Sequence, residues 1–313
     1  MEDYPKTLAE FEHWFASEEG CRAYLTRVRW PEGPICQRCG HTTLWPTKRD
    51  LLVCTECGYQ MSVTAGTIFE GTHKPVSLWF RAMWYVTSQK TGASALGLQR
   101  ILGLATYYTA WTWLHKLRRA MVRPGRDRLS GTVEVDETYI GGPKPGKRGR
   151  GAAGKSLVMI AAEVKDTRTG RIRLLRVDDA SAQSLRPAVE QAVLPGSVVH
   201  TDDWTGYRSL SSEGYLHEVI RPSEAVGDNL LPHCHRVASL LKRWMLGTHQ
   251  GAITHEHLDY YLDEFTFRFN RHTSRHRGKL FYRLVQQAAA IEPTTYKDMV
   301  KHVRPRSRAD YNP

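Results

Sequence analysis

The stretch Thr132-Val133-Glu134-Val135-Asp136-Glu137-Thr138-Tyr139 alternates β-branched or aromatic residues with polar ones. This period of two predicts a β-strand with one buried face, so that Val133 and Val135 point to one side and Glu134, Asp136 and Thr138 to the other. A carboxylate in the middle of a strand is costly to bury without a partner. Two interpretations follow: the polar side is the solvated face of an edge strand, or a bound metal ion compensates its charge.

The composition indicates a protein with a sizeable core and an anionic partner. The chain has 313 residues, of which 41% are hydrophobic, enough for one large domain or two to three smaller ones. The formal net charge of +12 and a pI near 9.5 favour nucleic acid over a membrane as that partner. No apolar run approaches the length of a membrane span, and residues 1–5 do not resemble a signal peptide. We therefore expect a cytosolic protein without a membrane partner, whose six cysteines are metal ligands or free thiols.

Four of the cysteines form two CxxC pairs about 15 residues apart, the spacing of a structural zinc ribbon. They are Cys36, Cys39, Cys54 and Cys57. A glycine follows each pair, at Gly40 and Gly58, where the tight turn of a metal-binding knuckle needs a positive φ. This pattern predicts a structural zinc ion held by four thiolates, with no open position. Unrelated free thiols and a redox pair are the weaker alternatives, and Cys21 and Cys234 are expected to be free.

Two parts of the first half are predicted to be helical. In residues 7–29, apolar residues recur at helical spacing and are expected to pack against the next module. Residues 76–121 predict three helices, over 77–88, 94–102 and 107–121, and Gly103 marks the break of a helix-turn-helix. This arrangement favours DNA binding, with a plain helical bundle as the alternative. The basic residues expected to contact DNA here are Lys116, Arg118 and Arg119.

The second half predicts a mixed β-sheet. Strands over 156–165 and 170–177 follow the opening strand, and a helix from Ser181 to about residue 193 leads to a strand over 197–201. Three antiparallel strands, a helix and a parallel central strand would place Asp136 and Asp202 on adjacent strands. The loop 141–151 is basic and lacks apolar anchors, so we expect it to contact phosphates. Its predicted contact residues are Lys144, Lys147, Arg148 and Arg150.

These segments resemble the motifs of bacterial insertion-sequence transposases. The resemblance covers nearly the whole chain, from Arg29-Trp30-Pro31 to Asn270. Its motifs are Val135-Asp136-Glu137-Thr138-Tyr139, Thr201-Asp202-x-Trp204-x-Gly206-Tyr207 and Ser239-Leu240-Leu241-Lys242-Arg243. The branch that the chain resembles joins a zinc ribbon to a DDE catalytic domain of the RNase H and retroviral-integrase fold. The resemblance implies that Asp136 and Asp202 are the first two ligands of the catalytic metal ions, with Asp203 as the less favoured alternative to Asp202.

The third metal ligand is where the chain departs from most of this family, which has a Glu seven residues before a Lys on the next helix. Counted back from Lys242, that position is His235. Seven residues turn a helix by about 700°, so the two side chains share a face. Other branches that the chain resembles have His or Asn here. A neutral imidazole is a softer donor than a carboxylate, so Mg²⁺ should bind less tightly and Mn²⁺ should serve better. The open alternatives are a zinc-like cluster of His233, Cys234 and His235, and surrogate acids at Glu224 and Asp228.

The C-terminal part of the chain is strongly basic. Residues 271–313 hold ten Lys or Arg against three Asp or Glu, which is over half of the net charge. Beside a nuclease-like site, such a tail is expected to follow DNA. The preceding helix, over 256–270, has aromatic residues at helical spacing and is expected to be core. Further predicted DNA contacts are Arg243, Arg275, Arg277 and Lys279.

These observations predict a multidomain chain of the α+β and α/β classes. A zinc ribbon and helix-turn-helix-like helices would precede an RNase H-like mixed sheet with flanking helices. The predicted boundaries are 1–75 for the N-terminal helices and zinc ribbon, 76–128 for the helical segment and linker, 129–291 for the catalytic domain and 292–313 for the tail.

The resemblance implies a DNA transposase that binds the inverted repeats of its element, cuts DNA and joins it to a target. It would use Mg²⁺ or Mn²⁺ for catalysis and Zn²⁺ for structure. It would act on double-stranded DNA as a homodimer or higher homo-oligomer, in the bacterial cytoplasm and at the nucleoid. Two alternatives stay open: a catalytically idle DNA-binding protein descended from such an enzyme, and a metal-dependent nuclease of the same fold that never joins strands.

Overall fold

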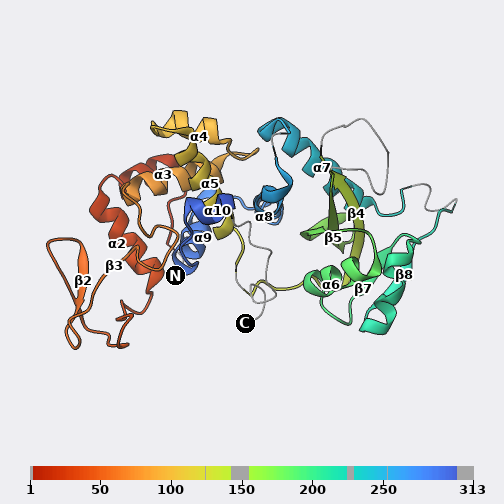
Figure 1. Ribbon diagram of the computed structural model, residues 1–313, viewed down its shortest axis with the longest axis horizontal. Helices are drawn as coiled ribbons and strands as arrows, with labels where there is room; N and C mark the ends of the chain where they lie inside the picture. The colour runs from red at the N-terminus through yellow and green to blue at the C-terminus, as the bar shows by residue number, and fades with distance from the viewer. Residues whose placement is uncertain (1–2, 124, 142–154, 224–228, 252, 302–313) are drawn as a thin grey trace. The chain divides into compact units, whose positions relative to one another are not determined.

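A computed structural model describes residues 3–123, 125–141, 155–223, 229–251 and 253–301 (Figure 1). The described residues form two compact units. The first unit holds residues up to 123 together with those from 273 to 301, and the second holds those from 125 to 272. The predicted basic loop at 144–150 and the surrogate acids Glu224 and Asp228 lie outside the described residues.

The first unit is mainly helical. Its helices are α1 (Leu8–Trp14), α2 (Glu18–Arg29), α3 (Val76–Ser88), α4 (Ala95–Leu102), α5 (Tyr107–Ala120), α9 (Arg277–Ala290) and α10 (Tyr296–Lys301). Side chains of Ser94 and Thr106 accept hydrogen bonds at the N-termini of α4 and α5, and Gly103 ends α4 with a φ of 62°. The three helices predicted over 76–121 and the break between the last two are therefore present.

Helix α9 belongs to the first unit, whereas the predicted boundary placed it in the catalytic domain. Phe281 lies in an aromatic core, with ring centroids 5.6 Å from Phe15 and 5.4 Å from Phe80. The helix packs against α2 and α3. The apolar face of an amphipathic helix shows that it must be covered but does not identify its partner, which is why sequence position alone misplaced this helix.

A small antiparallel sheet completes the first unit. Its strands are β1 (Leu44–Pro46), β2 (Leu51–Cys54) and β3 (Gln60–Ser62), in that order. Leu51 and Leu52 pair with Ser62 and Met61, and Met61 is buried. The three strands are too short to bury a core of their own, so this module depends on other stabilisation, which the cysteines provide.

The second unit is built on a five-stranded mixed sheet of order β6-β5-β4-β7-β8 (Figure 1). The strands are β4 (Thr132–Ile140), β5 (Ser156–Lys165), β6 (Arg168–Val177), β7 (Val198–Thr201) and β8 (Leu216–Val219). Strands β4 to β6 are antiparallel, β7 runs parallel to β4, and β8 runs parallel to β7. This confirms the predicted RNase H-like mixed sheet. The edge strand β8 was not predicted, because its four residues carry no clear alternation.

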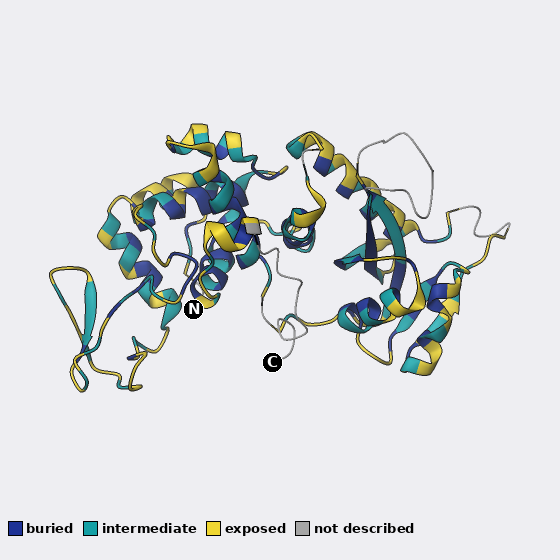
Figure 2. Ribbon diagram, viewed as in Figure 1, coloured by how far each residue is buried: buried dark blue, intermediate teal, exposed yellow. Residues whose placement is uncertain are grey.

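Helices cover both faces of this sheet. Helix α6 (Ala182–Ala192) and the 3₁₀ helix η1 (Thr205–Glu213) lie on one face, and α7 (Pro232–His249) and α8 (Leu258–Phe269) lie on the other. A short 3₁₀ helix, η2 (His255–His257), precedes α8. Figure 2 shows buried residues along the sheet and exposed ones along the outer side of α7.

Strand β4 is a central strand, so the interpretation of a solvated edge strand is wrong. Val133 and Val135 are buried in the core under α6, whereas Ile140 belongs to the core under α7 and α8. The carboxylate of Glu134 is also on the α7 side and is only 4% exposed. Because both faces of β4 are covered, its acidic side chains need specific partners.

None of the helices in the described part of the chain combines the length and apolar character that crossing a membrane requires.

Candidate active site and structural metal centre

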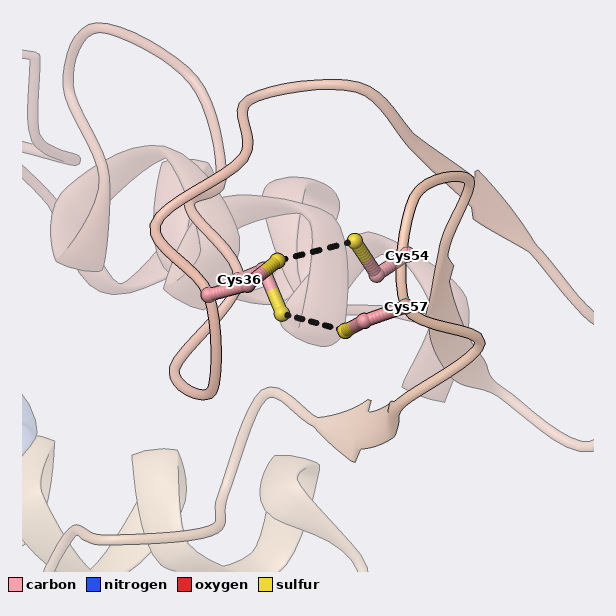
Figure 3. Close-up of side chains that lie close together, drawn as sticks. Cys36, Cys54 and Cys57 are labelled. Carbon is pink, nitrogen blue, oxygen red and sulfur yellow. Dashed lines mark hydrogen bonds between the residues drawn. The ribbon is translucent and has the colours of Figure 1, made fainter.

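The four cysteines of the two CxxC pairs come together in the first unit (Figure 3). Sγ atoms are 3.6 Å apart for Cys36 and Cys57 and 3.5 Å apart for Cys39 and Cys54. All four sulfur atoms lie within 4.8 Å of one another. Thiolates about 2.3 Å from a tetrahedral zinc ion are about 3.8 Å from each other, so this set fits zinc. The predicted four-cysteine ligand set is confirmed.

Two glycines allow the knuckles to turn tightly. Gly40 and Gly58 have φ values of 76° and 67°, and their amides donate to the carbonyl oxygens of Cys36 and Cys54. Although burial opposes it, hydrogen bonds from amides of the first knuckle lower the pKa of the Cys36 thiol to about 6. The backbone therefore favours the thiolate, which is the form that binds metal.

The other two cysteines are buried free thiols, as predicted. Burial, with a contribution from Glu18, raises the pKa of Cys21 to about 12. Cys234 is fully buried and its Sγ donates to the carbonyl oxygen of Ile160. Both thiols stay protonated near neutral pH and act as small core side chains.

Asp136 on strand β4 and Asp202 just after the parallel strand β7 lie opposite each other. The register of β4 and β7 pairs Thr132 with Val198 and Glu134 with His200. Continued by two residues, this register puts Asp202, just beyond β7, opposite Asp136. Because side chains alternate along a strand, Asp136 belongs to the sheet face that α7 covers, and the charge of Asp202 is close enough to act on it. Adjacent placement of these two acids follows from the predicted order of strands.

The environment of Asp136 disfavours its negative charge. Burial raises the pKa of this carboxyl to about 6, and the charges of Glu137 and Asp202 add to the rise. The amide of Glu137 donates to Asp136 Oδ1 over 2.8 Å and acts in the opposite direction, as does His235. Two carboxylates close enough to raise the pKa of one of them favour a divalent cation.

The backbone of α7 brings His235 to this pair. Its Nε2 atom is 3.5 Å from Asp136 Oδ2. Its Nδ1 atom lies 2.5 Å from Asn229 Oδ1, and an amide oxygen only accepts, so Nδ1 carries the hydrogen. In the neutral imidazole the Nε2 lone pair would then face Asp136, which is the arrangement that a metal-ligating imidazole requires.

Glu134 fixes the start of α7, a role that the sequence alone did not indicate. The helix begins with Pro232, and the N-cap residue Leu231 offers no side-chain acceptor. Glu134 Oε2 accepts hydrogen bonds instead from the amides of His233, over 2.8 Å, and Cys234, over 2.9 Å. A buried carboxylate at a helix N-terminus satisfies unpaired amides and interacts favourably with the helix dipole. The strand that carries Asp136 thereby sets the position of the helix that carries His235.

The zinc-like cluster of His233, Cys234 and His235 does not form. His233 Nδ1 lies 2.9 Å from Thr169 Oγ1, and Cys234 points into the core, so the three side chains diverge. Consecutive helical residues are about 100° apart, which leaves no common ligand position. Within the described ranges, the four cysteines alone gather at least three metal-binding atoms within 4.8 Å of one another. Asp136, Asp202 and His235 are thus a looser, open set.

Asp202 sits in a turn that the Asp-x-Trp-x-Gly-Tyr motif defines. Its Oδ1 accepts from the amide of Trp204 over 3.1 Å, and the indole Nε1 of Trp204 donates to the carbonyl oxygen of Ala180 over 2.7 Å. A Cβ on Gly206 would come within 2.6 Å of that same oxygen, so only glycine fits. Asp203, the alternative ligand, is exposed and pairs with Arg221 over 3.2 Å.

The predicted DNA contacts differ in how accessible they are. Arg118 is 2% exposed, and the half-buried Lys116 donates to the carbonyl oxygen of Ile68. Arg118 therefore lies in the core of the first unit, and Lys116 is partly engaged there. Helical spacing does not give the rotation of the basic face of a helix, so the sequence did not indicate this burial. Arg119 and Arg277 are half-buried; the exposed ones are Lys242, Arg243, Arg275 and Lys279.

The fold and these sites define a chain in which a four-cysteine zinc ribbon is combined with an RNase H-like domain. Residues 16–60 match the model of the transposase zinc-ribbon domain, and residues 128–270 match the model of the ISXO2-like transposase domain. The second match covers nearly the same residues as the second unit. The chain therefore belongs to the insertion-sequence transposases that carry an N-terminal zinc ribbon.

A curated relative supports this membership. The chain is 25% identical over 298 residues to an uncharacterized protein in transposable element ISH50 of Halobacterium salinarum. The match covers 88% of this chain and 98% of the relative, so the similarity extends across both units.

Proposed function

We propose that this transposase binds the terminal inverted repeats of its own mobile element, cleaves DNA there and joins the freed ends to a target. The observation that carries this proposal is the position of Asp136 on β4 beside Asp202, which directly follows the parallel strand β7, with His235 Nε2 3.5 Å from Asp136 Oδ2. A nuclease site of this kind needs oxygen and nitrogen donors on a solvent-accessible face. The half-buried carboxylates and the 48% exposed His235 side chain meet that need.

Asp136, Asp202 and His235 would hold Mg²⁺ or Mn²⁺. When bound, such ions activate the attacking oxygen and stabilise the leaving oxygen of a phosphodiester. The protein's contribution is to hold these three ligand side chains in position before the metal ion binds. Asn229 keeps the His235 lone pair directed at Asp136, and Glu134 keeps α7 at a fixed distance from β4.

Exposed cations near these donors would hold the DNA backbone. Lys242 follows His235 by two turns of α7, on the same side of the helix, and is exposed. Its ammonium would bind a phosphate next to the scissile one, and Arg243 would extend the contact along the strand. The uncompensated net charge of +12 is consistent with an extended phosphate interface.

The first unit would recognise the element ends. It combines the zinc ribbon with the helix-turn-helix-like helices α4 and α5, whose exposed residues include Arg100. Because two element ends must be cut and joined in a coordinated way, we expect at least a homodimer on DNA. The basic segments at 144–150 and 302–313 would add contacts that do not depend on sequence.

The test is a cleavage and strand-transfer assay on duplexes that carry the DNA flanking the gene, with a supercoiled plasmid as target. Mg²⁺ or Mn²⁺ should produce nicks at the element ends and then joined products, and Asp136→Asn should produce neither. Specific binding without nicking would identify the idle DNA-binding protein. Nicking without joined products would identify a nuclease that does not transfer strands.

A further inference from the structure

Strand β4 uses its two faces for different purposes. Asp136 is on the face covered by α7, and the next residue, Glu137, is on the face covered by α6 and η1. There the hydroxyl of Tyr207 donates to Glu137 Oε2 over 2.7 Å. Tyr207 is fully buried, and burial, with the nearby carboxylate of Glu137, raises its pKa well above the usual value, so the hydroxyl keeps its proton.

Tyr207 is the far end of the turn that begins with Asp202. Between them, Trp204 hydrogen-bonds to Asp202 Oδ1 through its amide and to the carbonyl oxygen of Ala180 through its indole. Gly206 packs against that same carbonyl with no room for a side chain. Tyr207 then fastens the segment to β4. The turn is therefore held at Ala180 and at Glu137, and its first residue is Asp202.

We infer that Glu137 and Tyr207 form a positioning pair that sets where the Asp202 carboxylate stands relative to Asp136. The inference rests on the proposed metal-dependent function of these two acids. Asp136 and Glu137 are adjacent in one strand, so a bond to Glu137 ties the Asp202 turn to the backbone that carries Asp136. Groups that orient metal ligands without touching the metal commonly affect metal affinity by about 10- to 100-fold.

Packing alone does not account for this contact. The Tyr207 ring lies in the core under α6, where a phenylalanine ring would fill the same volume. What tyrosine adds is one buried hydroxyl, and its partner is the carboxylate beside a catalytic one. The same core holds a comparable hydroxyl with no link to the site: Tyr215, 3% exposed, donates to the carbonyl oxygen of Val193 over 3.1 Å.

These two tyrosines give a matched experiment on the full-length, zinc-loaded protein. Tyr207→Phe and Tyr215→Phe each remove one buried hydroxyl from one core and should lower the melting temperature by similar amounts. Mn²⁺ binding without DNA is measured from the electron paramagnetic resonance of free Mn²⁺. Tyr207→Phe should weaken it by about tenfold or more, and Tyr215→Phe should leave it unchanged. Cleavage by Tyr207→Phe should need correspondingly more Mn²⁺.

If Tyr207→Phe does not fold, variants of Glu137, its hydrogen-bond partner, test the same contact. Glu137→Gln keeps an oxygen that accepts from Tyr207 and should bind Mn²⁺ more tightly than Glu137→Ala, which has no acceptor. Equal Mn²⁺ affinities for the two tyrosine variants, or for the two Glu137 variants, would overturn the positioning role. A wild-type protein that binds no more Mn²⁺ than Asp136→Asn would instead overturn the proposed function, and the positioning role with it.

Discussion

The two candidate metal centres of this protein are built in opposite ways. The cysteine cluster draws its four ligands from one short segment, and each knuckle is shaped by its own backbone and glycine. The carboxylate and imidazole set draws on β4, on the turn after β7 and on α7, which are far apart in the sequence. Contacts at Glu134, Glu137 and Asn229 hold those three elements in place.

In the first unit the metal site should stabilise the fold, whereas in the second unit the fold positions the residues of the metal site. The three ribbon strands are too short to bury a sufficient core, so the free energy of zinc binding should supply most of the free energy that folds the ribbon. In the second unit the sheet has an apolar core on each face, and burial raises the pKa of Asp136 to about 6. The cluster should therefore fail by unfolding, whereas the open site should fail in function while the fold persists.

Loss of zinc should give the largest effect. Cys36→Ser removes a thiolate from a site whose metal contributes on the order of 10 kcal/mol, so the ribbon should unfold and release its zinc. Elemental analysis and limited proteolysis of residues 16–60 measure this. Cys21→Ala, which removes a buried thiol outside the cluster, is the control and should keep one zinc per chain. Active protein without zinc would contradict the conclusion that the cysteine site holds the fold of the first unit's zinc ribbon.

Loss of a carboxylate should abolish activity and spare the fold. Asp136→Asn or Asp202→Asn removes a charged oxygen donor, so cleavage and joining should fall below detection while DNA affinity is retained. Without metal, Asp136→Asn should melt no lower than the wild type, because a buried amide costs less than a buried carboxylate. Asp203→Asn, at the exposed neighbour paired with Arg221, should keep activity. An inactive Asp203→Asn with an active Asp202→Asn would reverse the assignment.

Substitution of His235 tests the third donor. His235→Ala should weaken metal binding by at least the roughly 10- to 100-fold typical of losing a group that only orients a ligand. His235→Glu restores a carboxylate on the same helical face and should shift the metal preference from Mn²⁺ toward Mg²⁺. Cleavage rates titrated with each ion measure both effects. If His235→Ala cleaves like the wild type, His235 is not a ligand, and Glu224 and Asp228 become the candidates.

A scaffold contact of the second unit should give the smallest effect and a defined pH dependence. Glu163, 2% exposed, accepts from Arg171 Nη2 over 2.6 Å and from the amide of Ser130. Although burial opposes it, these bonds lower the pKa of Glu163. Its stabilising contribution is therefore complete above the unfolded pKa of about 4.3 and is lost as pH falls through the lower folded value.

Glu163→Gln should accordingly cost about 1–3 kcal/mol at pH 7. The difference in unfolding free energy between this variant and the wild type should shrink as the pH drops below about 4.3. Hydrogen exchange of peptides from β4 to β6, measured by mass spectrometry at several pH values, follows this difference. The zinc content should not change. A difference that is independent of pH, or a variant that also loses zinc, would show that the two centres are not independent.

The parts of this molecule that the sequence predicted are those set by local spacing. The cysteine knuckles, the alternation of β4 and the order of the strands all depend on residues close in the chain. The contacts that complete the open site could not be predicted in this way. Whether Glu134 meets the amides of α7, or Tyr207 meets Glu137, depends on how elements pack across the sheet.

Two further differences have the same origin. Lys116 and Arg118 are basic residues at helical spacing, but the rotation of α5 turns them inward. Helix α9 has an ordinary amphipathic face. The contacts of its Phe281 with Phe15 and Phe80 join segments that are far apart in the sequence, so local spacing does not indicate them. One signal could have pointed to it: an aromatic residue, Phe281, in a helix that the predicted catalytic fold did not require.

The place of α9 has a consequence for the order in which the chain folds during synthesis. The first unit closes only when α9 packs on α2 and α3, and every strand of the second unit is made between α3 and α9. The second unit is thus an insertion in the first, and all of it leaves the ribosome before α9 does. Contacts between distant segments form late. The sheet of the second unit can therefore assemble first, and the helical core of the first unit is completed last.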